Sequence, residues 1–143
     1  MRISRPCTIV IKSDVTIFIV DDDTSVLKAL KRLIMSAGFN VREYSSAHSF
    51  LNCGYEKQAG VLILDVQMPE MSGIEVQQKV VDSGSKMPII FITAHENEDI
   101  KKAALQAGAV AFFQKPIEQN TIIRAIFTEL EKPTRGARHD SAI

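Results

Sequence analysis

The stretch VTIFIVDDD at residues 15–23 joins an apolar run rich in β-branched residues to three consecutive aspartates. Such a run is typical of a strand that is buried on both faces of a parallel sheet. Residues 24–37 then carry apolar side chains at helical spacing, and Gly38 follows at the position where a helix cap belongs. The stretch therefore predicts a buried strand and a helix, with carboxylates between the two.

The alternation of strand and helix continues to residue 131 and predicts five strand–helix units. Parallel strands joined by helices require right-handed crossovers, and the helices then cover both faces of the sheet. We therefore expect an α/β fold of the flavodoxin-like class, with a five-stranded parallel doubly wound sheet in the order 2-1-3-4-5 and five helices. The other strands are predicted at residues 39–44, 61–64, 88–92 and 110–113, and the other helices at 46–51, 73–83, 97–107 and 118–131.

The composition fits one globular domain with no global attraction to nucleic acid or to an anionic membrane. Of the 143 residues, 45% are hydrophobic and 24% are charged, and the 17 basic side chains balance the 17 acidic ones. We expect an N-terminal extension over residues 1–14, a single domain over 15–131, and a disordered tail or linker stub over 132–143.

Cysteine usage and the length of the apolar runs argue against two further classes. Cys7 and Cys53 lack the spacing of a zinc site or a disulfide scaffold, and they suit a reducing cytosol, so we expect a cytoplasmic protein. The longest apolar runs are far shorter than the ~20 residues that cross a bilayer, so no membrane span is expected.

Polar side chains follow four of the predicted strands and should meet at one edge of the sheet. In doubly wound sheets the ligand site lies beyond the carboxyl ends of the strands. Asp21, Asp22 and Asp65 would repel one another there unless a divalent cation held them ionised, and carboxylates without histidine or cysteine favour Mg²⁺. Thr93 and Lys115 suit a phosphoryl group. The set predicts a phosphoryl-transfer site in which one aspartate is the nucleophile.

Four sequence blocks resemble the signature blocks of response-regulator receiver domains from two-component signalling. They are VDDD at 20–23, LILDVQMPEMSG at 62–73, FITAH at 91–95 and FFQKP at 112–116, and they occur in the order and spacing of that family. The resemblance covers residues 15–131. The segments MPEMSG at 68–73 and AGA at 107–109 resemble the FixJ-type subclass most.

This resemblance implies a role for each matching residue. Asp65 is the acceptor that attacks the phosphorus of a kinase phosphohistidine. Asp22 and Asp65 would bind Mg²⁺ directly, Asp21 would act through water, and the backbone carbonyl of Gln67 would complete the protein's ligands. Thr93 and Lys115 would bind the phosphoryl group.

Further roles follow from the same resemblance. Phe112 matches the rotating aromatic residue of the switch, and Lys115 and Pro116 match a pair joined by a cis peptide bond. Gln67 and His95 occupy positions that tune the lifetime of the phosphoryl group. Pro69 and Gly73 shape the loop after the acceptor.

The function expected from these residues is a phosphorylation-controlled switch rather than an enzyme that acts on an external substrate. The predicted helix at 97–107 offers small side chains that bury little area, so the face that it forms with the last strand and helix should repack. We expect this face to control a partner protein or dimerisation. The expected partners are a sensor histidine kinase, an output protein or a fused output domain outside this chain, and a second copy of the chain on phosphorylation; neither nucleic acid nor membrane is expected as a direct partner.

Two alternatives remain open from the sequence. DDDTS at residues 21–25 superficially resembles the nucleophile block of haloacid-dehalogenase-type phosphatases, with Asp21 as nucleophile and Asp23 as acid/base. Ser25 departs from that pattern. The other alternative is a degenerate receiver that binds its partner as an adaptor without phosphate. A phosphatase would be labelled on Asp21, whereas a receiver would be labelled on Asp65.

Overall fold

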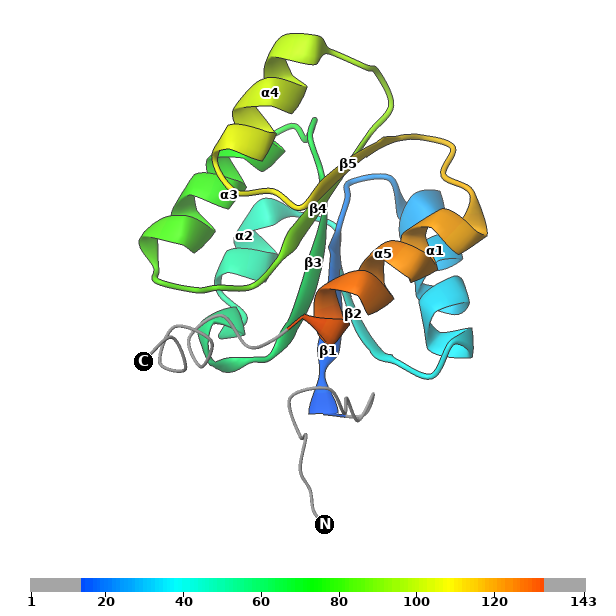
Figure 1. Ribbon diagram of the computed structural model, residues 1–143. Helices are drawn as coiled ribbons and strands as arrows, with labels where there is room; N and C mark the ends of the chain where they lie inside the picture. The colour runs from blue at the N-terminus through cyan, green and yellow to red at the C-terminus, as the bar shows by residue number, and fades with distance from the viewer. Residues whose placement is uncertain (1–13, 133–143) are drawn as a thin grey trace.

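The computed structural model describes residues 14–132, in which five parallel strands form one sheet in the order β2-β1-β3-β4-β5 (Figure 1). The strands are β1 Thr16–Val20, β2 Asn40–Tyr44, β3 Gly60–Asp65, β4 Ile89–Thr93 and β5 Ala111–Gln114. The helices are α1 Thr24–Ser36, α2 Ala47–Leu51, α3 Gly73–Asp82, α4 Glu98–Gln106 and α5 Gln119–Glu131. This is the fold class expected from the sequence.

One element differs from the expected series of strands and helices. A short 3-10 helix, η3 at Tyr55–Lys57, precedes β3 and was not predicted. Residues 1–13 of the expected N-terminal extension and residues 133–143 of the expected C-terminal tail lie outside the described residues.

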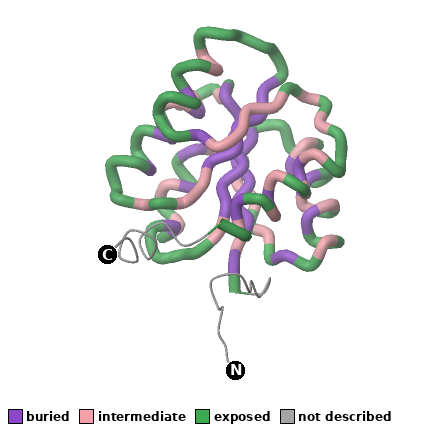
Figure 2. Tube along the Cα trace, viewed as in Figure 1, coloured by how far each residue is buried: buried purple, intermediate pink, exposed green. Residues whose placement is uncertain are grey.

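The sheet separates two hydrophobic layers because successive residues of each strand point to opposite faces. Strand residues such as Val20 and Leu64 pack with α2, α3 and α4, whereas Ile19 and Ile63 pack with α1 and α5. Figure 2 shows the strands as the buried centre and the outer sides of the helices as exposed. The sheet is therefore covered on both faces, as the continuous apolar strands require.

The helix α4 is the least anchored of the longer helices. Ala104 is its buried residue, Ile100 is half-buried, and Ala103 and Ala107 are exposed. The sequence predicts side chains here that bury little area, and Ala104 is the residue that α4 buries.

Strand pairing brings the carboxyl ends of four strands to one level. Val20 pairs with Leu64, so the next residues, Asp21 and Asp65, stand side by side. Thr93 pairs with Gln114, which places Lys115 next to the end of β4. The beginning of β1 and the end of α5 lie at the opposite edge of the sheet (Figure 1). Within residues 14–132, no helix has both the length and the apolar character that crossing a membrane requires.

Candidate functional site

Three carboxylates gather at the carboxyl edge of the sheet. One oxygen each from Asp21, Asp22 and Asp65 lies within 4.8 Å of the others. Asp21 is fully buried and Asp65 is 3% exposed, whereas Asp22 is exposed and faces solvent. The strand order therefore brings these residues together as the sequence analysis expected, while their roles as metal ligands stay a prediction.

Lys115 supplies the positive charge inside this cluster. Its Nζ atom lies 2.7 Å from Asp21 Oδ2 and 3.3 Å from Asp65 Oδ1. The backbone fixes its position, because the Lys115 N–H donates to the Thr93 carbonyl at 2.7 Å. The peptide bond between Lys115 and Pro116 is cis. The ammonium group thus contacts both buried carboxylates at once.

The electrostatics of the cluster leave more negative charge than one lysine offsets. Burial, and then the nearby Asp21 carboxylate, raise the pKa of Asp65 to about 6 despite the attraction of Lys115. Burial acts to lower the pKa of Lys115, but its hydrogen bond to Asp21 and the two carboxylates outweigh that effect and raise it. A hard divalent cation bound among these oxygens would relieve the repulsion, so the donor set fits Mg²⁺.

Asp23 does not belong to this cluster, although it adjoins Asp22 in the sequence. Its side chain caps α1 and accepts hydrogen bonds from Ser25 N at 3.0 Å, Ser25 Oγ at 2.6 Å and Val26 N at 3.4 Å. The hydrogen bond from the Ser25 side chain is the main cause that lowers the pKa of Asp23. A carboxylate held ionised in a cap is poorly suited to the acid/base role that the phosphatase alternative requires.

The hydroxyl of Thr93 makes its hydrogen bonds with the loop that follows β4. Thr93 Oγ1 donates to the His95 carbonyl at 2.9 Å and accepts from His95 N at 3.3 Å. Thr93 is 1% exposed, whereas His95 is exposed. The residue therefore lies at the expected edge, with its hydroxyl hydrogen-bonded to the backbone.

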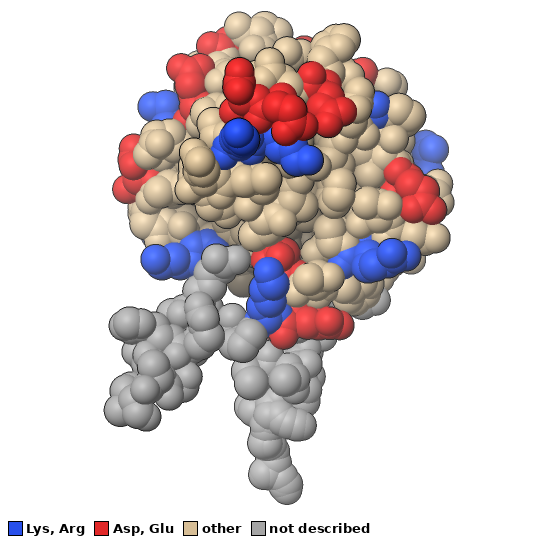
Figure 3. All heavy atoms as spheres, turned by 45° about the horizontal axis from the view of Figure 1, so that its top comes forward, with Lys and Arg blue, Asp and Glu red and all other residues tan. Residues whose placement is uncertain are grey.

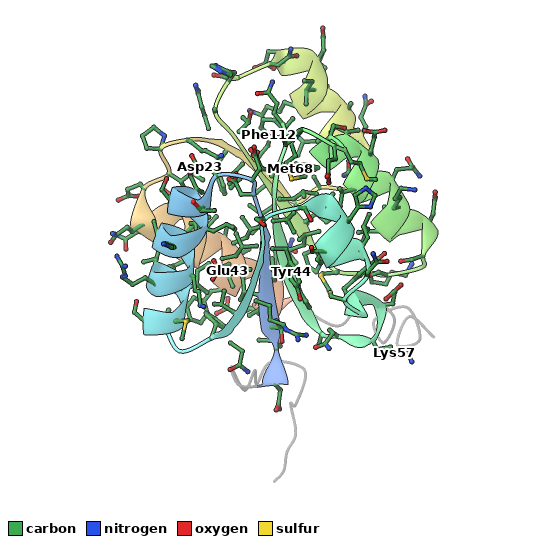
Figure 4. All side chains as sticks on the ribbon, turned by 180° about the vertical axis from the view of Figure 1, so that it is seen from behind. Asp23, Glu43, Tyr44, Lys57, Met68 and Phe112 are labelled. Atoms are coloured by element: carbon green, nitrogen blue, oxygen red, sulfur yellow. The ribbon has the colours of Figure 1, made fainter. Side chains whose placement is uncertain are left out.

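Phe112 lies on the face of the sheet that α2, α3 and α4 cover. It is half-buried, and its ring is tilted at 38° to that of Phe91 with the centroids 5.9 Å apart. In Figure 4, Phe112 lies with Met68 and Asp23 at the end of the sheet that carries the aspartates. The Phe112 ring therefore packs against the core cluster on one side and stays partly exposed.

The loop after β3 is packed directly against the backbone of Asp65 and Val66. Gly73 N donates to the Val66 carbonyl at 2.7 Å, and a Cβ atom on Gly73 would lie 2.3 Å from the Asp65 carbonyl oxygen. Ser72 and Glu75 form a reciprocal capping box that starts α3 at this point. Gln67, in the same loop, is exposed.

Sequence reasoning did not identify the hollow beside this loop. It has a volume of about 150 Å³. Its lining combines Asp22, a candidate metal ligand, with apolar side chains such as Met68 and Met71. Asp22 and Glu70 are the acidic residues of its lining. Figure 3 shows acidic side chains gathered beside a few basic ones toward the end of the molecule that is the top of Figure 1. The lining residues are Asp22, Ser45, Ser46, Ala47, Met68, Pro69, Glu70 and Met71.

Comparison with known proteins agrees with this geometry. The family model described as the response regulator receiver domain matches residues 17–127 of the sequence. The response regulator protein TmoT of Ectopseudomonas mendocina is 47% identical over 115 residues, which cover 80% of this chain and 52% of TmoT. The transcriptional regulatory protein FixJ of Rhizobium meliloti is 40% identical over 114 residues, or 80% of this chain and 56% of FixJ. The chain thus spans about half the length of the curated relatives that it matches.

Solved structures show the same arrangement. The structure of FixJ-N superposes with a TM-score of 0.78 at 38% identity and covers 85% of this chain and 98% of that one. The structure of the response regulator StyR gives a TM-score of 0.81 at 39% identity and covers 91% of this chain and 67% of that one. The similarity to FixJ in both comparisons agrees with the subclass expected from the sequence.

Proposed function

The chain belongs to the response regulator receiver domain family, and from this we propose that residues 15–131 form a switch that accepts a phosphoryl group on Asp65 from a sensor histidine kinase. The observation that carries the proposal is the contact of one lysine, Lys115, with the buried carboxylates of Asp21 and Asp65. A partly buried carboxylate beside an ammonium group and further acidic oxygens is suited to phosphoryl transfer.

The reaction proceeds by attack of an Asp65 carboxylate oxygen on the phosphorus of a phosphohistidine. The new O–P bond forms as the P–N bond breaks, and the imidazole nitrogen keeps the electron pair. Mg²⁺, when bound, neutralises charge on the phosphoryl oxygens. Asp22, Asp65 and the Gln67 backbone carbonyl would hold it directly, and Asp21 would act through water.

Lys115 and Thr93 act on the product of this step. The Lys115 ammonium already contacts Asp65 at 3.3 Å, so it can bind a phosphoryl oxygen without leaving Asp21. The Thr93 hydroxyl must give up its hydrogen bond to the His95 carbonyl before it can donate to the phosphoryl group. Loss of that bond frees the loop before α4, and Phe112 then turns inward. The face formed by α4, β5 and α5 repacks as a result.

The output of the switch is control of a partner protein, a fused output domain or a second copy of the chain by this face. The chain catalyses its own phosphorylation and dephosphorylation rather than turnover of an external substrate, and it does not bind nucleic acid itself. Gln67 and His95 are both exposed and follow Asp65 and Thr93 by two residues, positions from which they can orient or exclude the water that hydrolyses the acyl phosphate. The family supports a cytoplasmic location.

Labelling with a small phosphodonor tests the proposal. Incubation of the chain with acetyl phosphate and Mg²⁺ should add one phosphoryl group by intact mass, and borohydride trapping should locate it on Asp65. Asp65→Asn should abolish the label, whereas Asp23→Asn, a matched change in the neighbouring cap, should retain it. Label on Asp21 would support the phosphatase alternative instead. A chain that takes no label would support the degenerate adaptor and would refute the phosphorylation switch.

A further inference from the structure

A buried amide side chain joins α3 to α4. Gln77 is 1% exposed, and its Nε2 atom donates to the Ala104 carbonyl oxygen at 3.0 Å. Ala104 is fully buried and is the residue by which α4 is anchored. Figure 1 shows α3 and α4 next to each other on one face of the sheet. The amide therefore bridges the two helices where α4 is held most firmly.

Packing alone does not account for an amide at this position. The Ala104 carbonyl already accepts from Ala109 N at 3.0 Å, so it would keep a partner without Gln77. Among the described residues, Gln77 Oε1 has no hydrogen-bond partner although it is buried. Burial of a polar atom without a partner is unfavourable, and methionine would fill a similar volume without that cost.

The same face of α3 leads back to the acceptor. Gly73 lies four residues before Gln77, one helical turn away on the same side of the helix. Gly73 contacts the backbone of the acceptor strand, since its N–H donates to Val66 and no Cβ would fit beside the Asp65 carbonyl. One end of the buried face of α3 thus touches the acceptor, and the next turn holds α4.

The N-terminal half of α4 is free to respond to this contact. Glu98 and Asp99 are exposed, Ile100 is half-buried against the core cluster, and Ala104 is the buried residue of α4. A small displacement of the first turn of α3 would change the distance between Gln77 and Ala104. In the part of the chain that the structure describes, Gln77 Oε1 has no partner in this arrangement, so a shift of α3 against α4 that gives this oxygen a donor would offset the loss of the bond to Ala104.

We propose that Gln77 is a positioning residue that latches α4 to α3 in the unloaded protein, and that loading of Asp65 breaks the Gln77–Ala104 hydrogen bond and releases α4. The proposal rests on the proposed function, because it takes Asp65 as the acceptor. It adds a route through α3 to the route through Thr93 and Phe112. Because coupling is reciprocal, removal of the latch should also make loading easier.

The experiment measures both directions of this coupling by ¹⁵N NMR of the full chain with Mg²⁺ and fluoroberyllate, a mimic of the acyl phosphate. In the unsubstituted protein, the side-chain amide protons of Gln77 should shift on addition, and their exchange with solvent should speed up by about tenfold or more. Gln77→Met should bind fluoroberyllate at least about threefold more tightly, with the Ala109 amide already displaced toward its loaded position.

Gln78→Met is the matched control, since Gln78 is the exposed neighbour and its Nε2 atom bonds Asp82 Oδ1 at 2.9 Å. It should bind fluoroberyllate as the unsubstituted protein does. If Gln77→Met fails to fold, the Gln77 side-chain signals of the unsubstituted protein still decide the question.

The outcomes separate this inference from the proposed function. If the backbone signals beside Asp65 respond and the Gln77 side-chain signals do not, the latch is overturned but the proposed function is not. Equal affinities of Gln77→Met and Gln78→Met would overturn it as well. Failure of the unsubstituted protein to respond to fluoroberyllate at Asp65 and Val66 would refute the proposed function, and the latch with it.

Discussion

Lys115 and Asp21 form an ion pair of 2.7 Å between Nζ and Oδ2, although they are 94 residues apart in the sequence. Asp21 follows β1 and Lys115 follows β5, and these strands are separated in the sheet by β3 and β4. The pair therefore connects the ends of two strands that are not neighbours. It also places the Lys115 Nζ atom closer to Asp21, at 2.7 Å, than to Asp65, at 3.3 Å.

We expect Lys115→Ala to lower the free energy of unfolding by about 2–4 kcal/mol at neutral pH without Mg²⁺, because it leaves the fully buried Asp21 carboxylate unpaired. Added Mg²⁺ should restore part of the loss. Lys31→Ala breaks an exposed ion pair with Glu43 and should cost less than about 1 kcal/mol. Urea unfolding with and without Mg²⁺ measures all three effects, and equal losses for the two variants would contradict the expectation.

The pKa of Asp65 predicts a stability change with pH. Because burial raises this pKa to about 6 from 3.8, the folded protein binds the proton more tightly than the unfolded chain. The contribution of Asp65 to stability is thus fully present below about pH 4 and is lost as the pH rises through about 6.

Asp65→Asn removes this dependence. Without Mg²⁺, we expect it to be more stable than the unsubstituted protein at neutral pH by about 1–2 kcal/mol after allowance for solvent screening, and the difference should vanish toward about pH 4. Urea unfolding across this range measures it. A difference that does not change with pH would show that the ionisation of Asp65 is not its cause.

Gly73→Ala tests the close contact between α3 and the acceptor strand. The added Cβ would lie 2.3 Å from the Asp65 carbonyl oxygen and 3.0 Å from Val66 Cα, so one of these backbones must shift. We expect a loss of about 2–4 kcal/mol in unfolding free energy and weaker binding of Mg²⁺.

Gly84→Ala serves as the comparison for Gly73→Ala. Gly84 has a φ of +88° and open space around it, so the substitution should cost about 1 kcal/mol through backbone strain alone. Binding of Mg²⁺, followed by NMR titration, should be unchanged in this variant. The contact model fails if Gly73→Ala is the milder of the two.

Asp23→Ala separates the cap of α1 from the chemistry of the site. The Asp23 side chain accepts hydrogen bonds from the first turn of α1, and the substitution should move the urea midpoint to lower concentration. Labelling by acetyl phosphate should persist, because Asp23 is not among the clustered carboxylates. Loss of the label in a folded variant would instead favour the acid/base role of the phosphatase alternative.

The sequence was sufficient to predict the positions that depend on strand order. Asp21, Asp65 and Lys115 follow apolar runs whose ends must meet once the sheet is parallel and doubly wound. Two features of side-chain packing escaped prediction. Gln77 was indistinguishable from a solvated helix residue, because its burial depends on where α4 lies. The direction of the Thr93 hydroxyl depends on the path of the loop through His95.

Helix α5 is another case in which the spacing of apolar residues does not fully predict which side chains are buried. Ile122 and Ile126 are buried at helical spacing, whereas Leu130, one turn further on, is only half-buried and Glu129 is 9% exposed. The Glu129 carboxylate contacts Lys132 at 2.7 Å, which compensates for its burial. Periodicity locates the face of a helix, but it does not reveal which polar residues find a partner near its end.

The opposite placement of the aspartates and of the end of α5 divides the molecule into two poles (Figure 1). A polypeptide that continues past residue 131 departs from the pole remote from Asp65, so attachment of a neighbouring module there leaves the approach of a phosphodonor unobstructed. A module held at that pole would respond to a change at Asp65 through rearrangement of the helices between the two poles.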